Sequence, residues 1–169
     1  MQVDIRAKDK HDRKPTHFEC TLDLSALTRW GAHPFPQPVR ISGNAVFNGD
    51  YYEISYTVHG ISHAACSRCL EDIHTTLEQS FTRTAMEADD SVSPWGDTIA
   101  LSDGMLDVTA MVSADLLLEM EGIPLCRDDC PGLCSVCGKH KDIPCGCETV
   151  PPDPRFDALR ELLNNDTNK

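Results

Sequence analysis

The chain has 169 residues and a mass of 18.7 kDa, which suits one domain, alone or with a small appendage. It carries 27 acidic and 15 basic side chains, a formal net charge of -12 at pH 7, so it is poorly suited to coat nucleic acid non-specifically. It contains no apolar run of about 18 residues, and residues 1–14 lack the apolar segment of a signal peptide. We therefore expect a cytoplasmic protein without a membrane partner.

The charge is unevenly distributed along the chain. Residues 1–17 carry five basic and three acidic side chains, whereas residues 71–121 carry twelve acidic side chains and one basic one, Arg83. A solvated surface is the simplest interpretation of this acidic stretch. The functional alternative is a surface that meets a basic partner, such as a ribosomal protein, and does not meet free RNA.

Alternating apolar residues predict strands in the first half of the chain. The clearest pattern is a β-hairpin at Asn48-Gly49, a pair typical of short hairpin turns. Its apolar residues are Val39, Ile41, Ala45 and Phe47 before the turn and Tyr52, Ile54, Tyr56 and Val58 after it. Residues 72–84 predict another strand, and weaker or shorter strands are expected at 17–24 and 99–101. Three prolines make residues 31–38 an extended connection.

One main helix is expected after these strands. Asp107 is a suitable N-cap, and an apolar stripe continues to about Glu121. The stripe consists of Met111, Val112, Leu116, Leu117 and Met120. Gly122 and Pro124 are expected to end the helix, and the acidic, Ser- and Pro-containing residues 87–98 predict a loop before it.

Eight of the nine cysteines form four close pairs, a pattern typical of metal sites. The pairs are Cys66-x2-Cys69, Cys126-x3-Cys130, Cys134-x2-Cys137 and Cys145-x-Cys147. In a reducing compartment, clustered cysteines are more often metal ligands than disulfides. A structural zinc ion takes four ligands, typically thiolates, and Gly138 after Cys137 suits a turn with positive φ. Cys20 stands alone on an alternating strand and is interpreted as a small buried apolar residue.

The four pairs supply ligands for one or two zinc ions, and the grouping is open. The favoured first site contains the pairs that are closest in sequence, Cys134, Cys137, Cys145 and Cys147. The second site then joins Cys66 and Cys69 to Cys126 and Cys130 and closes a long loop. A rival grouping places Cys126, Cys130, Cys134 and Cys137 on one ion. His63 and His140 are the candidates for a substitute ligand.

Other interpretations of the cysteines are weaker. Disulfides would require a secreted protein, and an iron–sulfur cluster would also take four thiolates. A closed all-thiolate site leaves no position for a catalytic water. His17-Phe18-Glu19 matches half of the zinc deaminase motif and the other half is missing, and the P-loop, Gly-x-Gly-x-x-Gly and Gly-x-Ser-x-Gly motifs are absent. We therefore expect no enzymatic activity and no small-molecule substrate.

The fold class that these patterns predict is α+β. We expect a twisted antiparallel sheet or a partial β-barrel, with one main helix and a cysteine-rich C-terminal segment stapled by zinc. The expected organisation is an α+β domain at 1–124 and a zinc-binding loop segment at 125–150 docked on it. A short C-terminal helix and tail follow at 151–169, where Asp153-Pro154 provides the N-cap and first residue of the helix. Its apolar face would present Phe156, Leu159 and Leu163.

The C-terminal two thirds of the chain resemble a known family. The run DVTAMVSADLLLEMEGIPLCRDDCPGLCSVCGK, followed by CGC and DPRFDALREL, is similar to the C-terminal signature of the YceD family. These are the large ribosomal RNA subunit accumulation proteins, also described as metal-binding and as candidates for nucleic-acid binding. CSRCL at 66–70 resembles the first cysteine pair of that family. The resemblance covers roughly residues 60–163. The chain departs from the family pattern at Ser135, where proline is frequent in the family, and at residues 139–141, which replace an Asn-rich loop.

The resemblance implies a role in the synthesis, processing or stability of large-subunit ribosomal RNA, without known enzymatic activity. It also implies that the eight paired cysteines bind metal. Because a net charge of -12 fits generic RNA binding poorly, RNA would contact a small basic patch, or a basic ribosomal protein would contact the acidic surface. The patch consists of Arg68, Arg127, Lys139 and Lys141, for which solubility is the simpler interpretation. A thiol-based redox or metal sensor is the alternative function.

Overall fold

The computed structural model describes residues 1–6, 14–88, 98–120, 122–148 and 153–156. The chain forms two compact units, Met1–Asp128 and Asp129–Lys169. The first unit contains the strands and the main helix. The predicted segment boundaries at residues 124 and 150 stay predictions.

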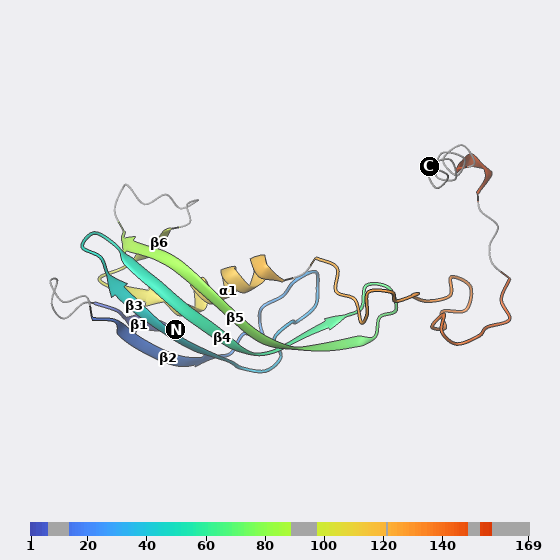
Figure 1. Ribbon diagram of the computed structural model, residues 1–169, viewed down its shortest axis with the longest axis horizontal. Helices are drawn as coiled ribbons and strands as arrows, with labels where there is room; N and C mark the ends of the chain where they lie inside the picture. The colour runs from blue at the N-terminus through green and yellow to red at the C-terminus, as the bar shows by residue number, and fades with distance from the viewer. Residues whose placement is uncertain (7–13, 89–97, 121, 149–152, 157–169) are drawn as a thin grey trace, which may run out of the picture. The chain divides into compact units, whose positions relative to one another are not determined.

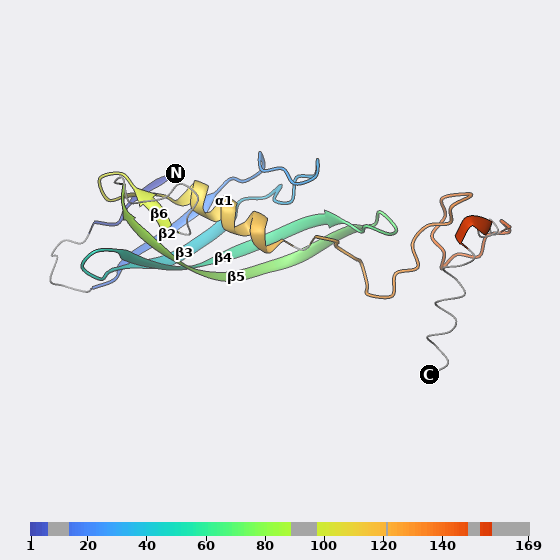
Figure 2. The same cartoon turned by 90° about the horizontal axis from the view of Figure 1, so that it is seen from above.

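Five strands form an open, twisted sheet in the first unit (Figures 1 and 2). In spatial order they are β2 (Thr16–Leu22), β3 (Val39–Phe47), β4 (Tyr52–Ala65), β5 (Asp72–Glu87) and β6 (Thr98–Leu101). β1 (Gln2–Asp4) and β7 (Met105–Asp107) form a separate two-stranded sheet. β4 and β5 are the longest strands, and they continue as a two-stranded ribbon past the residue where β3 begins (Figure 1).

The strands that the alternation predicts are confirmed. The hairpin between β3 and β4 forms, but its loop has four residues, because Phe47 pairs with Tyr52. The backbone N–H of Asn48 donates to the carbonyl oxygen of Tyr51 over 2.8 Å. Gly49 takes a φ of +97°, which glycine adopts without steric cost. The asparagine–glycine pair therefore locates the turn correctly, but the loop is longer than the two-residue loop that this pair typically forms.

Of the two architectures expected, the twisted sheet forms and the partial barrel does not, because α1 (Val108–Glu119) covers the apolar face that a barrel would bury against itself. The sheet is also not wholly antiparallel, because β6 pairs in parallel with the end of β5. The short alternation at 99–101 contains no information about strand direction, so the sequence pattern does not distinguish a parallel from an antiparallel pairing.

The main helix begins where the sequence predicts. The side chain of Asp107 accepts a hydrogen bond from the backbone N–H of Ala110 over 3.1 Å, as an N-cap does. The helix ends at Glu119, before the predicted end, because Met120 is already extended. At this end, Nη1 of Arg29 donates to the carbonyl oxygen of Leu117 over 2.5 Å, which places a cation where the helix dipole is negative.

The core lies between α1 and the inner face of the sheet. The buried apolar residues of α1 are Val108, Met111, Val112 and Leu116. They pack with sheet residues that include Ile41, Ile54 and Val58, all fully buried. Burial of one such side chain contributes about 1.5–3 kcal/mol, so this contact holds the helix in place. Cys20 is 8% exposed within the same core, which confirms its interpretation as a buried apolar residue.

A polar network crosses this core at Asp115, which is 3% exposed. The hydroxyl of Tyr56 on β4 donates to one carboxylate oxygen of Asp115. Nε of Arg83 on β5 donates to the other oxygen over 2.8 Å, and the two side chains form an ion pair. The network satisfies a buried charge and joins α1 to two strands, which fixes the position of the helix along the sheet.

The far end of the chain is described only in part. Pro154–Phe156 form a short 3-10 helix, and the N–H of Arg155 donates to the side chain of Asp153. The rest of the predicted C-terminal helix, and residues 89–97 of the predicted loop, lie outside the described residues. α1 has 12 residues and is the longest helix in the described part of the chain, too short to cross a bilayer.

Replacing Tyr56 tests the polar network. Tyr56→Phe keeps the ring and removes the hydroxyl that donates to Asp115. We expect the free energy of unfolding to fall by about 1–3 kcal/mol, because a buried carboxylate loses a donor. Urea denaturation of the metal-loaded protein measures this. Tyr51→Phe is the control, since Tyr51 is exposed, and it should change stability by less than about 0.5 kcal/mol. Equal stabilities would contradict a structural role for the network.

The raised pKa of Tyr56 leads us to expect that the folded state loses stability at alkaline pH. Burial, and then the hydrogen bond to Asp115, raise the pKa of Tyr56 far above that of free tyrosine. A raised pKa in the folded state contributes stability that is present below about pH 10 and is lost as the pH rises further. We expect phenolate absorbance from Tyr56 to appear only together with unfolding. Ionisation of every tyrosine while the far-UV spectrum stays native would refute this.

Candidate metal centres

The first pair of cysteines lies in the turn between β4 and β5. The backbone N–H of Cys66 donates to the carbonyl oxygen of Glu71 over 2.8 Å, and the N–H of Leu70 donates to the carbonyl oxygen of Cys66 over 2.9 Å. Leu70 takes a φ of +63°, which is uncommon for a residue with a side chain and closes the turn. Both Cys66 and Cys69 are buried. The hairpin therefore holds two thiols together in a tight turn.

The chain after α1 brings two further thiols to this turn. The N–H of Ser67 donates to the carbonyl oxygen of Pro124 over 2.9 Å, which fixes the returning chain beside the hairpin. The sulfur atoms of Cys66, Cys69, Cys126 and Cys130 all lie within 4.8 Å of one another. Sγ of Cys69 and Sγ of Cys126 are 3.6 Å apart. This group could hold one metal ion.

Backbone donors favour ionisation of one thiol in this group. Burial of the Cys66 thiol raises its pKa, but backbone N–H groups of Cys126, Arg68 and Cys69 outweigh that effect and lower the pKa to about 6. Thiolates that accept several backbone hydrogen bonds are typical of cysteines in a metal-binding turn. The turn is thus prepared for a negatively charged sulfur.

The second group is formed within residues 134–147. The sulfur atoms of Cys134, Cys137, Cys145 and Cys147 lie within 4.8 Å of one another. The N–H of Gly138 donates to the carbonyl oxygen of Cys134 over 2.9 Å, and Gly138 takes a φ of +70°, which confirms the turn expected after Cys137. The N–H of Cys134 donates to the carbonyl oxygen of Lys139 over 2.7 Å, which closes the same turn.

The thiols of the second group have opposite acid–base tendencies. Backbone N–H groups of Cys137 and Val136 lower the pKa of Cys134 to about 6. The hydrogen bond between the thiols of Cys147 and Cys137 raises the pKa of Cys147 to about 12. Neighbouring sulfur atoms that ionise repel one another, so one thiolate makes the next harder to form. A cation among the four would remove this conflict.

The structure brings together the cysteines that the favoured grouping placed together. The rival set of Cys126, Cys130, Cys134 and Cys137 is divided between the two groups. Neither candidate histidine joins a group in the described part of the chain. His63 lies against His74, with their facing ring nitrogens 3.4 Å apart, and Nδ1 of His140 is 3.4 Å from a carboxylate oxygen of Asp142.

The four basic residues of the predicted RNA patch are all exposed. Arg68 and Arg127 belong to the first unit, and Lys139 and Lys141 belong to the second. Nη1 of Arg68 donates to the carbonyl oxygen of Asp128 over 3.3 Å, beside the first cysteine group. Contact of these residues with RNA stays a prediction.

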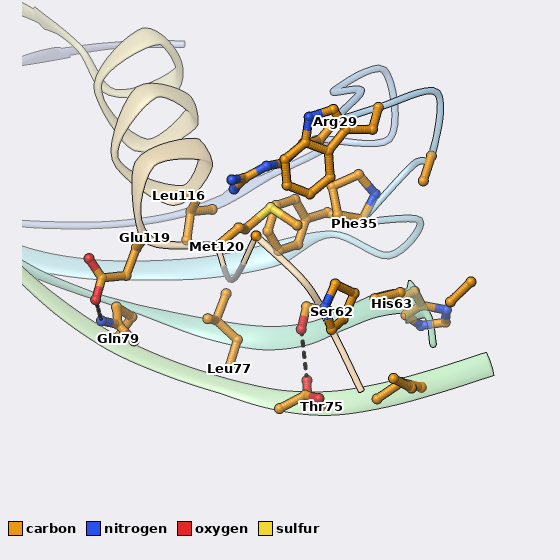
Figure 3. Close-up of a pocket in the computed structure, with 18 of the residues that line it drawn as sticks. Arg29, Phe35, Ser62, His63, Thr75, Leu77, Gln79, Leu116, Glu119 and Met120 are labelled. Atoms are coloured by element: carbon orange, nitrogen blue, oxygen red, sulfur yellow. Dashed lines mark hydrogen bonds between the residues drawn. The ribbon is translucent and has the colours of Figure 1, made fainter. Parts of the chain in front are cut away.

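One feature of the first unit has no counterpart among the sequence predictions. A groove of about 630 Å³ lies between the end of α1, the turn at Arg29-Trp30 and the inner face of β4 and β5 (Figure 3). Trp30 is 72% exposed although it is large and apolar. The sequence signal for this groove was a tryptophan that precedes a glycine next to a proline-rich connection, because a large apolar side chain in a turn is not part of the core.

Comparison with known proteins identifies the family. Residues 54–163 match the family described as "Large ribosomal RNA subunit accumulation protein YceD", and this range contains both cysteine groups. The chain therefore belongs to the YceD family, as the resemblance indicated.

The curated relatives are uncharacterized mycobacterial proteins. One, from Mycobacterium leprae, is 27% identical over 157 residues, which are 90% of this chain and 69% of the relative. Relatives from Mycobacterium bovis and Mycobacterium tuberculosis are 27% identical over 113 residues, which are 65% of this chain and 55% of each relative. No solved structure matches the chain.

Single cysteine substitutions should separate the two groups. We expect Cys137→Ser to lose one metal ion and the order of the loops around it, while the sheet stays intact. We expect Cys69→Ser to lose the other ion and to lower the stability of the first unit by several kcal/mol, on the order expected for a structural metal. Metal content and urea denaturation measure both effects. Cys20→Ala is the control, since Cys20 belongs to neither group. Equal, mild effects of the two serine variants would contradict a metal that clips the hairpin.

Proposed function

We propose that this protein is a non-enzymatic, zinc-binding factor that supports the synthesis, processing or stability of large-subunit ribosomal RNA. The observation that carries the proposal is the family match over residues 54–163, which includes all eight grouped cysteines. The proposal has the protein act in the cytoplasm, where it meets large ribosomal subunits during assembly. The metal would hold the binding surface in shape and take no part in chemistry.

Zinc is the metal that best fits both groups. A tetrahedral ion with Zn–S bonds of about 2.3 Å places its sulfur ligands about 3.8 Å apart. The separation of 3.6 Å between Cys69 and Cys126, and the upper limit of 4.8 Å in both groups, agree with ligands of a single ion. Thiolates around a multi-iron cluster bind different irons and need more space between them. One zinc ion in each group is therefore proposed.

The ligand sets favour a structural role over catalysis. A catalytic zinc keeps one position open for water or substrate, whereas four thiolates fill a tetrahedron. In the first group three of the four cysteines are buried. A zinc ion enclosed by four thiolates would contribute to folding and hold the loops around it in a fixed arrangement.

A basic protein suits this surface better than RNA does. The net charge of -12 repels phosphates, and each ion bound by four thiolates adds two further negative charges. The predicted RNA patch supplies four basic residues, which are few compared with this negative charge: Arg68, Arg127, Lys139 and Lys141. We therefore favour a basic ribosomal protein as the partner of the acidic stretch, 71–121, with contact to large-subunit ribosomal RNA as the alternative.

Genetic depletion tests the proposed function. We expect loss of the protein to lower large-subunit ribosomal RNA relative to small-subunit ribosomal RNA, measured by quantitative RNA gel analysis or sequencing. The wild-type chain and Cys20→Ala should restore the ratio, and Cys69→Ser should not, because it loses a structural metal. A ratio that stays unchanged on depletion would contradict the proposal.

A pull-down from native extract distinguishes the two partners. Ribosomal proteins retained after RNase treatment would support the acidic stretch as the binding surface. Large-subunit ribosomal RNA lost together with all proteins on RNase treatment would instead indicate direct contact with RNA. Arg68 and Arg127 would then be the first residues to replace.

A thiol-based sensor is the second candidate, favoured by the low pKa values of Cys66 and Cys134. Thiolates react with peroxide faster than thiols do, and close sulfur atoms can then form disulfides. A structural site keeps its zinc under mild peroxide, whereas a sensor releases it. Zinc release followed with a colorimetric chelator therefore decides between the two functions.

A further inference from the structure

The longest strand of the sheet has an edge with no partner strand over most of its length. On the side away from β4, β5 pairs with β6 only from Thr84 to Glu87. From Asp72 to Arg83, no strand of the described chain pairs with this side (Figure 2). Proteins usually protect such an edge with lysine, proline or a bulge, and residues 72–83 contain neither lysine nor proline. The edge is therefore a template for another strand.

The pairing of β4 defines which backbone groups face this edge. The N–H of His63 donates to the carbonyl oxygen of Pro34 over 2.8 Å and so points away from β5, which makes His63 and His74 a non-hydrogen-bonded pair. Just past the end of β5, the N–H of Ala88 donates to the carbonyl oxygen of Leu101 in β6, in the same alternation. Alternate residues therefore present their N–H and C=O groups outward, namely His74, Thr76, Glu78, Ser80 and Thr82.

The groove of about 630 Å³ adjoins this edge (Figure 3). Leu77 of β5 forms part of its floor, and Met120 and the turn at Arg29-Trp30 form its walls. Trp30 has a φ of +49°, a strained conformation for a bulky residue, and the guanidinium of Arg29 lies 4.3 Å from its ring centre. An exposed aromatic residue held in a fixed position beside an apolar groove is typical of a binding surface.

The charges around the groove and edge are negative. Glu119 lies where the groove meets β5, and its Oε1 accepts a hydrogen bond from Nε2 of Gln79 over 3.1 Å (Figure 3). Glu78 is exposed on the other face of the same strand. Of the nearby positive charges, Arg83 is balanced by Asp115, whereas Arg29 keeps its charge while it donates to the end of α1. An incoming strand would therefore find carboxylates on both of its faces.

We propose that β5 binds an extended, lysine- or arginine-rich protein segment, which adds a strand along residues 72–83 and places its inward side chains in the groove. Backbone hydrogen bonds would supply affinity, and the carboxylates would select basic side chains. A second copy of this chain is a poor occupant, because each copy carries a net charge of -12. The inference rests on the proposed function, which favours a basic ribosomal protein as partner.

Amide hydrogen exchange of the full, zinc-loaded chain tests this inference. The probe is a synthetic peptide of about ten residues in which lysine and valine alternate. We expect the peptide to slow exchange at the outward N–H groups of His74, Thr76 and Glu78, while those of Leu77 and Gln79, already bonded to β4, change little. Two control peptides should give no protection: one N-methylated at alternate residues, and one with glutamate in place of lysine.

Two variants with a matched control locate the contact on the protein. Thr76→Pro removes an outward N–H without removing a bond of the β4–β5 ladder, and we expect it to weaken peptide binding about tenfold or more. Trp30→Ala should weaken binding severalfold through the groove. Leu118→Ala is the control, since Leu118 is 78% exposed and lies outside the groove, and it should bind as the wild type does.

Three outcomes would overturn the inference. Protection spread over all acidic surfaces, equally strong with the N-methylated peptide, would mean attraction by charge alone. Protection of β5 that grows with protein concentration in the absence of peptide would mean pairing of two copies. If a single-stranded RNA, and not the peptide, slowed exchange at alternate N–H groups of β5, the edge would be a binding site for RNA. Because these readouts measure binding alone, they can fail while depletion still lowers large-subunit ribosomal RNA, so the two proposals are tested separately.

Discussion

The crowding of thiols is the constraint on which much of this structure depends. Four sulfur atoms within 4.8 Å of one another cannot all ionise in the absence of a cation, and four neutral thiols would contribute little more than small apolar contacts. The first group joins the turn after β4 to the chain that follows α1. A metal ion bound there, as we propose, would close a loop of more than fifty residues between Cys69 and Cys126, which the unfolded chain closes only at an entropic cost. Occupancy of that site and the fold of the first unit would then be one equilibrium.

The buried charge of Asp115 is a second constraint, and it acts on the same helix. A carboxylate that is 3% exposed needs its partners, so α1 can dock only where Tyr56 and Arg83 reach it. In that position the end of α1 accepts hydrogen bonds from the side chains of Arg29 and Gln79. The groove beside β5 has its shape because the helix that forms its wall is held by a network inside the core.

The parts of the fold that the sequence predicts are those set by local chemistry. The alternation in β3 and β4, the N-cap at Asp107 and the cysteine spacings each depend on residues a few positions apart. The parallel pairing of β6 and the choice of an open sheet over a barrel depend on which surfaces meet across long stretches of chain, and no local pattern encodes them. Asp115 was visible as an acid inside the apolar stripe of the helix, but its partners lie 32 and 59 residues away.

The acidic charge of the chain and the role of its family in ribosomal RNA accumulation are compatible if the protein binds the basic component of the ribosome. A basic segment bound to carboxylates on β5 and α1, as we propose, would be kept from non-specific contact with nucleic acid, since its charges would already be neutralised. RNA has a far higher density of negative charge than a folded protein, and binding to it releases condensed counterions. Large-subunit RNA would therefore draw the basic segment away from this surface, and the transfer would need no chemical step. This direction of transfer agrees with the structural role that we propose for the two cysteine groups, in which bound metal would hold a surface in shape.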